Sequence, residues 1–246
     1  MGIAMTMGLG SQQVDRSGKM KAFVRALPKV ETHLHLDGTL TPDLIQSLAR
    51  SQGHELGNKT VEEIAALAVV STPWPSLAAV LEAFVRINPL LHRADALDAV
   101  AYELCRKAAA QNIRYMEVRF APILHFAPGF NQDAVMTAVL GGLAKGKRDF
   151  GVGSGVIVTM LRNLSVEDNE SIYEVAKRFF GRGVVALDLA NDEARRPLSQ
   201  FAHLYQDAKS AGLSTTVHAG EVYPCRDFES ALDLGIDRIG HGVFLT

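Results

Sequence analysis

Short apolar stretches alternate with longer amphipathic stretches along the chain from Pro28 onward. β-Branched residues fill the short stretches, as is typical of strands, and the longer stretches repeat apolar residues at the three- and four-residue spacing of helices. Strands that alternate with helices predict an α/β domain with a parallel sheet. We expect six strands, over Val30–His33, Arg114–Phe120, Gly155–Leu161, Val184–Leu189, Ser214–His218 and Arg238–His241.

Single helices are expected in the later connections between these strands. The spacing predicts helices over Ala134–Lys147, Val166–Phe180 and Pro197–Ala211, and a shorter helix that opens near Asp227. Because one helix in each connection keeps neighbouring strands parallel, the carboxyl ends of the strands are expected at one end of the domain, where barrel enzymes build their active sites.

The connection between the first two strands is longer, at about 80 residues, than an ordinary crossover. Its Thr41-Pro42 pair marks a helix start, and Thr60 with Glu63 forms a capping-box pattern. We expect the segment Pro42–His92 to be a helical insertion that covers the mouth of the domain and closes on a substrate. The expected helices of this connection are Pro42–Gln52, Val61–Leu67, Ser76–Ile87 and Asp95–Gln111.

The first residues differ in character from the rest. Met1–Lys19 is rich in glycine, serine, methionine and glutamine and has no clear period, so we expect a flexible leader before a single domain over residues 20–246. Six strands fit an open doubly wound sheet, and they also fit an eight-stranded barrel that is truncated after its sixth strand. The pattern of elements leaves both architectures open.

Composition narrows the class of partner and compartment. Hydrophobic residues make up 48% and charged residues 21% of the chain, which is typical of a soluble globular protein. The net charge of −2 and the lack of a long basic block argue against nucleic acid as the natural partner. No stretch is long enough to span a membrane. Two cysteines, Cys105 and Cys225, make no disulfide framework, so we expect a cytoplasmic protein.

The most informative candidate chemistry is a pair of histidines at the end of the first strand. His33 and His35 are two residues apart, so a strand places both imidazoles on one face, where they can hold a single metal ion. The Asp37-Gly38 turn pair follows them directly. On this motif alone, two polar histidines in an ordinary turn remain an equally good interpretation.

Other strand ends also gather histidine and carboxylate side chains, whereas the strand interiors are apolar. The fourth strand ends in Asp188–Glu193, the fifth in Val217–Glu221 and the sixth in Gly240–Gly242. A mononuclear metal site at a barrel mouth needs this distribution, because neutral imidazoles hold the metal and a nearby carboxyl group moves protons. His218 as a ligand and Glu221 as a catalytic acid therefore become the favoured interpretations.

Each of these residues also has a structural interpretation. His218 can be a buried hydrogen-bonded histidine, Glu221 an acid at a helix N-terminus, and His241 a turn residue between two glycines. Asp188 is as well explained by a structural acceptor as by a functional group. We expect Glu117 and Arg119 to form an internal ion pair with each other. The remaining histidines are expected to be structural: His54, His92, His125 and His203.

Four motifs resemble one known family. Residues Leu27–Leu40 read LPKVETHLHLDGTL and are similar to the opening signature of the adenosine deaminases within the amidohydrolase superfamily. Tyr115–Pro122 (YMEVRFAP) resembles the second strand of that family, and Val217–Glu221 (VHAGE) and Arg238–Gly242 (RIGHG) resemble its fifth and sixth strands. The motifs occur in the family's order from about Met20 to the end of the chain, so together they are specific.

The resemblance implies a TIM-type (β/α)8 barrel with one Zn²⁺ per chain and the hydrolytic deamination of adenosine or 2′-deoxyadenosine to inosine or 2′-deoxyinosine. Carried over by motif, His33, His35 and His218 would be zinc ligands. Glu221 would protonate the purine ring nitrogen N1. His241 would orient and deprotonate the zinc-bound water.

The resemblance further implies that the partner is a small purine nucleoside. His35 and Asp37 would contact this substrate, Asp37 through the ribose, and the backbone near Asn191 would meet the purine. Alternatives that stay open are a deaminase of a related purine, such as adenine or a modified adenine nucleotide, and an inactive remnant that binds without turnover.

Two departures from the family's pattern bear on these expectations. Asn191 stands where the family usually has a glycine, and its side chain would narrow the purine slot or shift specificity. The family's last zinc ligand is an aspartate in an Asp-Asp pair after the eighth strand, which lies beyond the end of this sequence. We therefore expect a barrel that is truncated after the sixth strand.

Overall fold

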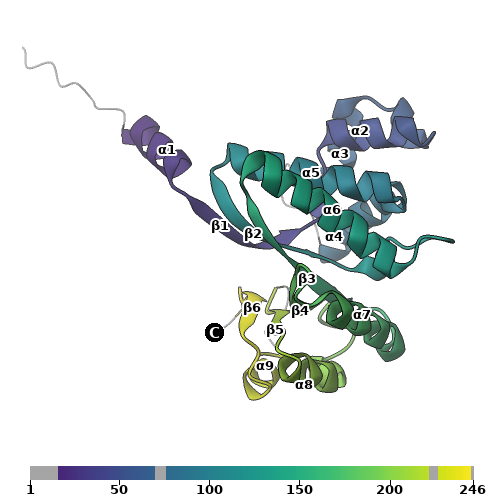
Figure 1. Cartoon of the computed structure of the whole chain (residues 1–246), viewed down its shortest axis with the longest axis vertical. Helices are drawn as coiled ribbons and strands as arrows, with labels where there is room; N and C mark the ends of the chain where they lie inside the picture. Colours follow the sequence, from purple (N-terminus) through teal and green to yellow (C-terminus); the bar gives the residue numbers. More distant parts are fainter. Residues whose placement is uncertain (1–15, 70–75, 222–226, 245–246) are drawn as a thin grey trace, which may run out of the picture.

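A computed structural model describes residues 16–69, 76–221 and 227–244, which form alternating strands and helices (Figure 1). The strands of this part of the chain are β1 (Lys29–His35), β2 (Ile113–Phe120), β3 (Gly153–Leu161), β4 (Val184–Ala190), β5 (Ser214–Ala219) and β6 (Arg238–His241). Its helices are α1 (Arg16–Ala26), α2 (Pro42–Ser51), α3 (Val61–Ala68), α4 (Leu77–Ile87), α5 (Ala94–Ala110), α6 (Gln132–Phe150), α7 (Val166–Phe179), α8 (Ala202–Ser210) and α9 (Phe228–Asp233).

The six described strands make one parallel sheet in the order of the sequence, β1 to β6. Helices α2 to α5 connect β1 to β2, and one α-helix lies in each later connection. This topology places the carboxyl ends of all six strands together, as the sequence predicted.

The sheet curves so that its two edge strands approach each other. A Cβ atom on Gly240 of β6 would lie 2.6 Å from Cε1 of the His33 ring on β1. Arg238 of β6 forms an ion pair with Glu117 of β2. The carboxyl ends of β1 and β6 are therefore neighbours in space although about 200 residues separate them, as closure toward a barrel requires.

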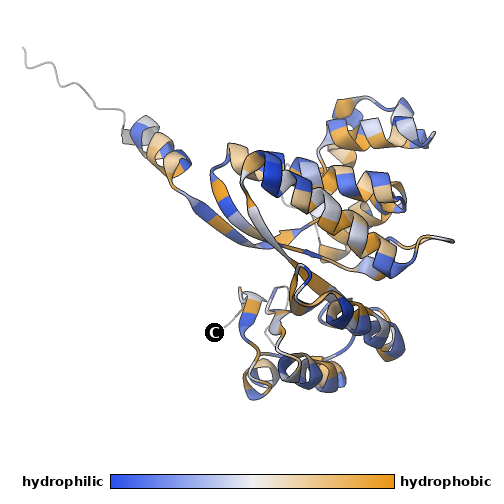
Figure 2. Ribbon diagram, in the orientation of Figure 1, coloured by the Kyte–Doolittle hydropathy of each residue, from blue (hydrophilic) through white to orange (hydrophobic). Residues whose placement is uncertain are grey.

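Helix starts follow local capping chemistry. The Thr41 hydroxyl accepts the N–H of Leu44 at the start of α2, and Pro42 occupies the first turn. Thr60 and Glu63 form the predicted capping box at the start of α3. Figure 2 shows hydrophobic and hydrophilic residues interleaved along the outer helices, as expected for helices that bury one face on the sheet.

The core lies between the sheet and its helices. Every residue of β4 except Val185, and β3 from Gly155 to its end, is buried, because helices cover the outer face and side chains fill the inner one. Helices α5 and α6 pack closely, since a Cβ on Gly146 would lie 2.3 Å from the Cβ of Cys105. None of the described helices combines the length and apolar character needed to cross a bilayer.

The observed elements differ from the predicted ones at three places. β1 extends to His35, so both histidines of the pair belong to the strand. The expected helix Pro197–Ala211 is divided into a 3₁₀ turn, Leu198–Phe201, and α8, and Asp227 accepts the N–H of Leu198 at the start of the turn. α1 begins at Arg16, inside the expected leader, and residues 1–15 lie outside the described residues.

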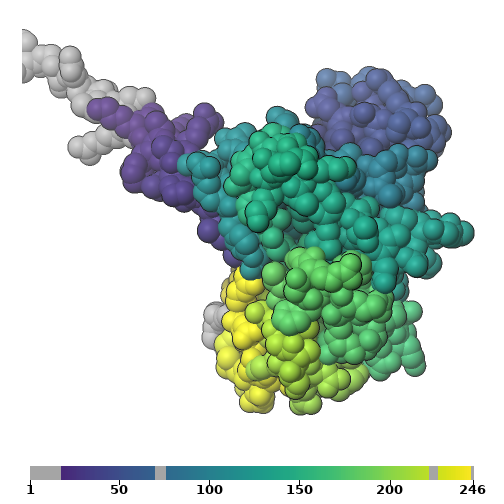
Figure 3. Space-filling view, in the orientation of Figure 1, coloured from purple at the N-terminus to yellow at the C-terminus, as the bar shows by residue number. Residues whose placement is uncertain are grey.

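The expected helical insertion is present after β1. Its helix α4 presents Leu77, Val80, Leu81 and Phe84 to the cavity at the carboxyl ends of the strands. Residues 70–75 of the insertion lie outside the described residues. At the opposite end of β1, α1 projects from the rest of the molecule (Figure 3).

Candidate active site

A cavity of about 270 Å³ opens at the carboxyl ends of the strands. The strands supply polar side chains to it and α4 supplies an apolar wall, which is the usual composition of a small-molecule site. The residues that line it are His33, His35, Asp37, Leu77, Val80, Leu81, Phe84, Phe120, Ala121, Leu124, Thr159, Leu161, Ala190, Asn191, His218, Glu221 and His241.

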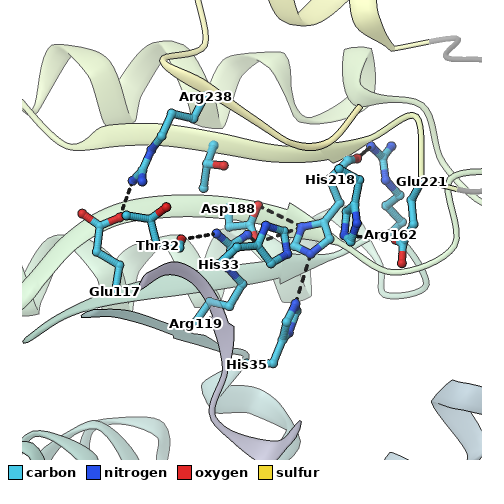
Figure 4. A network of polar contacts seen from close by, with 12 residues as sticks. Thr32, His33, His35, Glu117, Arg119, Arg162, Asp188, His218, Glu221 and Arg238 are labelled. Carbon is cyan, nitrogen blue, oxygen red and sulfur yellow. Dashed lines mark hydrogen bonds and ion pairs between the residues drawn. The ribbon is translucent and has the colours of Figure 1, made fainter. Parts of the chain in front are cut away.

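Three histidines from two strands converge at the base of this cavity. His33 and His35 come from β1 and His218 from β5, and one ring nitrogen of each lies within 4.8 Å of the other two. Nε2 of His35 and Nε2 of His218 are 3.1 Å apart (Figure 4). Nε2 of His33 is buried without a hydrogen-bond partner.

This donor set fits a zinc ion. Two ligands of a tetrahedral zinc at about 2.1 Å lie about 3.4 Å apart, close to the separation of the His35 and His218 nitrogens. A buried polar nitrogen without a hydrogen-bond partner lowers the folding stability by about 1–3 kcal/mol. Nε2 of His33 is such an atom, and a bond to a metal ion would give it a partner. The expected ligands His33, His35 and His218 are thus brought together.

The electrostatics of the two β1 histidines favour neutral imidazoles, the form that binds metals. Burial, assisted by the nearby Arg119 guanidinium, lowers the pKa of His33 to about 3. Burial and the neighbouring His218 lower the pKa of His35 to about 3. Both rings therefore carry a free lone pair at neutral pH.

A buried ion pair orients the third histidine. Asp188 of β4 lies 3.1 Å from Nδ1 of His218, which leaves Nε2 of that ring to face the cavity. Arg119 of β2 donates to Asp188 at 3.0 Å and to the carbonyl of Thr32 at 3.0 Å, as Figure 4 shows. Burial disfavours the Asp188 carboxylate, but its contacts with His218 and Arg119 hold its pKa below the usual range.

Two further polar side chains face the same centre. Nε2 of His241, at the end of β6, lies 3.6 Å from Oε2 of Glu221, which follows β5. The His241 ring centroid is 4.7 Å from that of His33 and 5.0 Å from that of His218. Burial lowers the pKa of His241, although the Glu221 carboxylate acts in the opposite direction.

Asp37 lies on the 3₁₀ turn after β1 and lines the cavity. Its side chain is buried and its Oδ1 atom has no hydrogen-bond partner. Burial raises the pKa of Asp37 to about 6, against the opposing effect of backbone hydrogen bonds. A ligand that donates a hydrogen bond to Oδ1 of Asp37 would supply the partner that this oxygen lacks.

Asn191 occupies a special backbone position at the end of β4. Its φ of 81° is left-handed, a region that glycine enters without cost and that asparagine tolerates better than most residues. Its side-chain oxygen accepts the N–H of Asp192 at 2.8 Å, which supports this turn. Asparagine therefore keeps the backbone shape and adds a side chain to the cavity wall.

Comparison with known proteins identifies the family. A family model described as adenosine deaminase matches residues 28–245. The chain belongs to the adenosine deaminase family. It is 36% identical over 220 residues to an adenosine deaminase of Clostridium perfringens (strain ATCC 13124) and 32% identical over 220 residues to one of Vibrio vulnificus (strain CMCP6). In both cases the match covers 89% of this chain and 66% of the relative, so the chain spans just under two thirds of the length of these curated relatives.

Solved structures confirm the predicted barrel fold. A zinc-bound amidohydrolase from Burkholderia ambifaria matches with a TM-score of 0.83 at 30% identity, over 96% of this chain and 64% of the other. The adenine deaminase of Arthrobacter aurescens matches with a TM-score of 0.78 at 31% identity, over 89% and 66%. The N6-mAMP deaminase of Arabidopsis matches with a TM-score of 0.77 at 26% identity, over 92% and 68%.

One expected contact in this deaminase family member is wrong. Glu117 and Arg119 do not pair with each other: Glu117 pairs with Arg238, and Arg119 pairs with Asp188. Residues two apart on a strand are nearly 7 Å apart along the backbone, whereas the curved sheet brings side chains of other strands closer. Asp188 is a structural acceptor, one of the two interpretations that the sequence left open.

The other histidines lie outside the cavity lining. His54 caps a 3₁₀ turn through the Leu56 N–H, and His92 contacts the Leu124 carbonyl. His203 lies 3.5 Å from Glu170 on the surface, and His125 is fully buried. These positions agree with the structural roles expected for them. Cys225 lies outside the described residues.

Two contributors to the site were missed in the sequence. Arg162 follows β3, is fully buried, and donates to the carbonyl of His218 at 3.0 Å while it pairs with Asp227 at 2.7 Å. A charged residue directly after a buried apolar strand is the signal that could have indicated it. Thr159 also lines the cavity, but a single threonine within an apolar strand carries no such signal.

Proposed function

We propose that this protein is a zinc-dependent deaminase of purine nucleosides, which converts adenosine and 2′-deoxyadenosine to inosine and 2′-deoxyinosine with release of ammonia. The observation that carries the proposal is the convergence of three histidines with a carboxyl group and a fourth histidine in one cavity. We place this activity in purine metabolism and in the cytoplasm.

His33, His35 and His218 would hold one zinc ion per chain, with their rings in the orientations described. Zinc at this position supplies a nucleophile at neutral pH, because it lowers the pKa of bound water to about 7. The Arg119–Asp188 pair keeps His218 aimed at the centre, and desolvation keeps the two β1 rings unprotonated.

The remaining residues divide the proton transfers between them. The 6-position of an aminopurine is a poor electrophile and ammonia is a poor leaving group, so the ring nitrogen N1 must be protonated as water attacks C6. Glu221 lines the cavity, and its carboxyl group would make this transfer. His241, whose pKa burial lowers, would accept a proton from the attacking water and orient it.

The polar groups at the cavity wall favour a nucleoside over a nucleotide. The unpaired oxygen of Asp37 is an acceptor for a sugar hydroxyl, and His35 lies beside it on the cavity wall. Among the described lining residues there is no lysine or arginine to pair with a phosphate. A phosphate next to Asp37 would instead meet a like charge.

Free adenine is a second candidate substrate. Asn191 lines the cavity, where its side chain would narrow the space for a purine, and the Arthrobacter aurescens structure that this chain resembles is an adenine deaminase. An enzyme for the free base would gain nothing from the acceptor on Asp37, so we rank the nucleosides first.

A substrate comparison tests the proposal. The zinc-loaded chain is assayed for ammonia release with adenosine, 2′-deoxyadenosine, adenine and N6-methyl-AMP. We expect kcat/KM for the two nucleosides to exceed that for adenine by about 10⁴-fold or more, as for a site built to hydrogen-bond a substrate hydroxyl. A preference for adenine or the nucleotide would contradict the nucleoside assignment. Zinc binding without turnover of any substrate would support the inactive remnant instead.

A further inference from the structure

We propose that Glu193 is a positioning residue that fixes the backbone of Glu221, the proposed proton donor. The inference rests on the proposed function, because Glu221 has a catalytic role only in that reaction. It assigns a task to a carboxylate that neither lines the cavity nor belongs to the histidine cluster.

The Glu193 carboxylate binds two consecutive backbone N–H groups. Oε1 accepts the N–H of Glu221 at 2.8 Å, and Oε2 accepts the N–H of Gly220 at 3.1 Å. Because each oxygen has its own donor, the carboxylate holds the peptide plane as well as its position. Hydrogen bonds to an ionised acceptor are about twice as strong as neutral ones.

The turn after β5 is shaped to present these donors. Gly220 has a φ of 65°, the left-handed conformation that glycine adopts without strain. A left-handed residue next to ordinary backbone turns successive N–H groups to one side, as in anion-binding nests. In this molecule the anion is a side chain from the loop after β4.

Glu193 is itself held by its loop. Asn191 is left-handed with φ 81°, and its side chain accepts the Asp192 N–H. The Asp192 carboxylate accepts the N–H of Ala194 at 3.0 Å, and the Asp192 carbonyl accepts that of Arg195 at 3.0 Å. The carboxylate of Glu193 therefore projects from a rigid turn rather than from a loose segment.

The Glu221 backbone is also held from the other side. The carbonyl of Gly220 accepts the N–H of Phe244 at 3.1 Å, and that of Ala219 accepts the N–H of Gly242 at 3.0 Å. The turn after β5 is therefore hydrogen-bonded on both sides, to the segment after β4 and to the segment after β6. With its backbone fixed, Glu221 is left with side-chain rotation alone to reach His241 at 3.6 Å.

The test compares two carboxylate-to-amide changes in adjacent residues of the full chain. Glu193→Gln leaves one acceptor oxygen and turns an NH₂ group toward a backbone donor. Asp192→Asn is the matched control, since it removes the same charge from the same loop and keeps the oxygen that accepts the Ala194 N–H. Hydrogen exchange at the Gly220 and Glu221 amides is measured in each zinc-loaded protein.

We expect exchange at these two amides to accelerate about tenfold or more in Glu193→Gln and to stay unchanged in Asp192→Asn. Equal exchange rates at these two amides in Glu193→Gln and the parent would contradict the proposal that Glu193 fixes this backbone. This measurement needs no turnover. If the parent were inactive but its Gly220 and Glu221 amides were protected from exchange, the proposed function would be refuted, whereas the role of Glu193 in holding this backbone would stand.

Kinetics then separate positioning from a general structural role. With adenosine, Glu193→Gln should lower kcat about tenfold or more and change KM less than about threefold. In the Glu221→Gln background the same change should have almost no further effect, because Glu193 acts through Glu221. An equal loss in both backgrounds, or a normal kcat for Glu193→Gln, would overturn the positioning role.

Discussion

At the scale of the residue, a charged pair inside the barrel supports the proposed metal site. Arg119 and Asp188 are almost completely buried, and among the described residues their charges are compensated by each other, by His218 and by the Thr32 carbonyl. A carboxylate behind a ligating histidine fixes the tautomer and raises the basicity of the ring. The pair therefore links the backbone of β1 to His218, the proposed ligand on β5.

Asp188→Asn should weaken zinc binding about 10- to 100-fold, because the His218 ring loses its anionic partner. The affinity is measured by competition with a chromophoric chelator. Asp98→Asn, which alters a partly exposed ion pair with Lys145, serves as the control and should bind zinc like the parent. Parent-like affinity in Asp188→Asn would contradict the orienting role of the carboxylate.

His125 should make the protein less stable in mild acid. Burial lowers its pKa to about 3 from 6.5, so the unfolded chain binds a proton between these values that the folded chain does not. Stability from this residue is full above pH 6.5 and falls as the pH decreases, by about 2 kcal/mol between pH 7 and 5. His125→Leu should reduce that loss by this amount in urea unfolding at several pH values. If the free energy of unfolding of the two proteins fell equally between pH 7 and 5, burial of His125 would not be the source of the loss.

At the scale of the element, strand ends and turns bring the site together. His33 and His35 could be placed from sequence because the two-residue period of a strand is local. The ion pair of Glu117 with Arg238 could not be predicted from the sequence, because it depends on the curvature that brings β6 close to β2. The contact of the Leu198 N–H with Asp227 could not be predicted either, because the two residues are remote in sequence.

Gly240 illustrates how closely β1 and β6 approach. Gly240→Ala should displace the His33 ring, because the new Cβ would lie 2.6 Å from its Cε1 atom. We expect zinc affinity to fall about tenfold or more with little change in far-UV circular dichroism. Gly141→Ala, where the nearest atom outside the helix is 3.4 Å away, is the control and should retain zinc affinity. Unchanged affinity in Gly240→Ala would show that the ring can move without loss.

At the scale of the whole molecule, the parallel topology concentrates chemistry at one end. Strands β1, β3, β5 and β6 each contribute polar side chains to one cavity, Asn191 joins them directly after β4, and α4 adds an apolar face. The family and the barrel were predictable because four motifs occur in order. The position of Arg162 after a buried strand carried a signal, but the contacts of Arg162 and Glu193 could not be predicted, since both bind backbone groups of another strand end.

The most direct test of the central claim is zinc-dependent turnover in the parent and in Glu221→Gln, with zinc content measured in the same samples. We expect one zinc per chain in both proteins, ammonia release from adenosine that stops on chelation and returns with zinc, and a rate about 10²- to 10⁴-fold lower in Glu221→Gln. Full activity after removal of the metal, or parent-like turnover by Glu221→Gln with zinc bound, would contradict that claim.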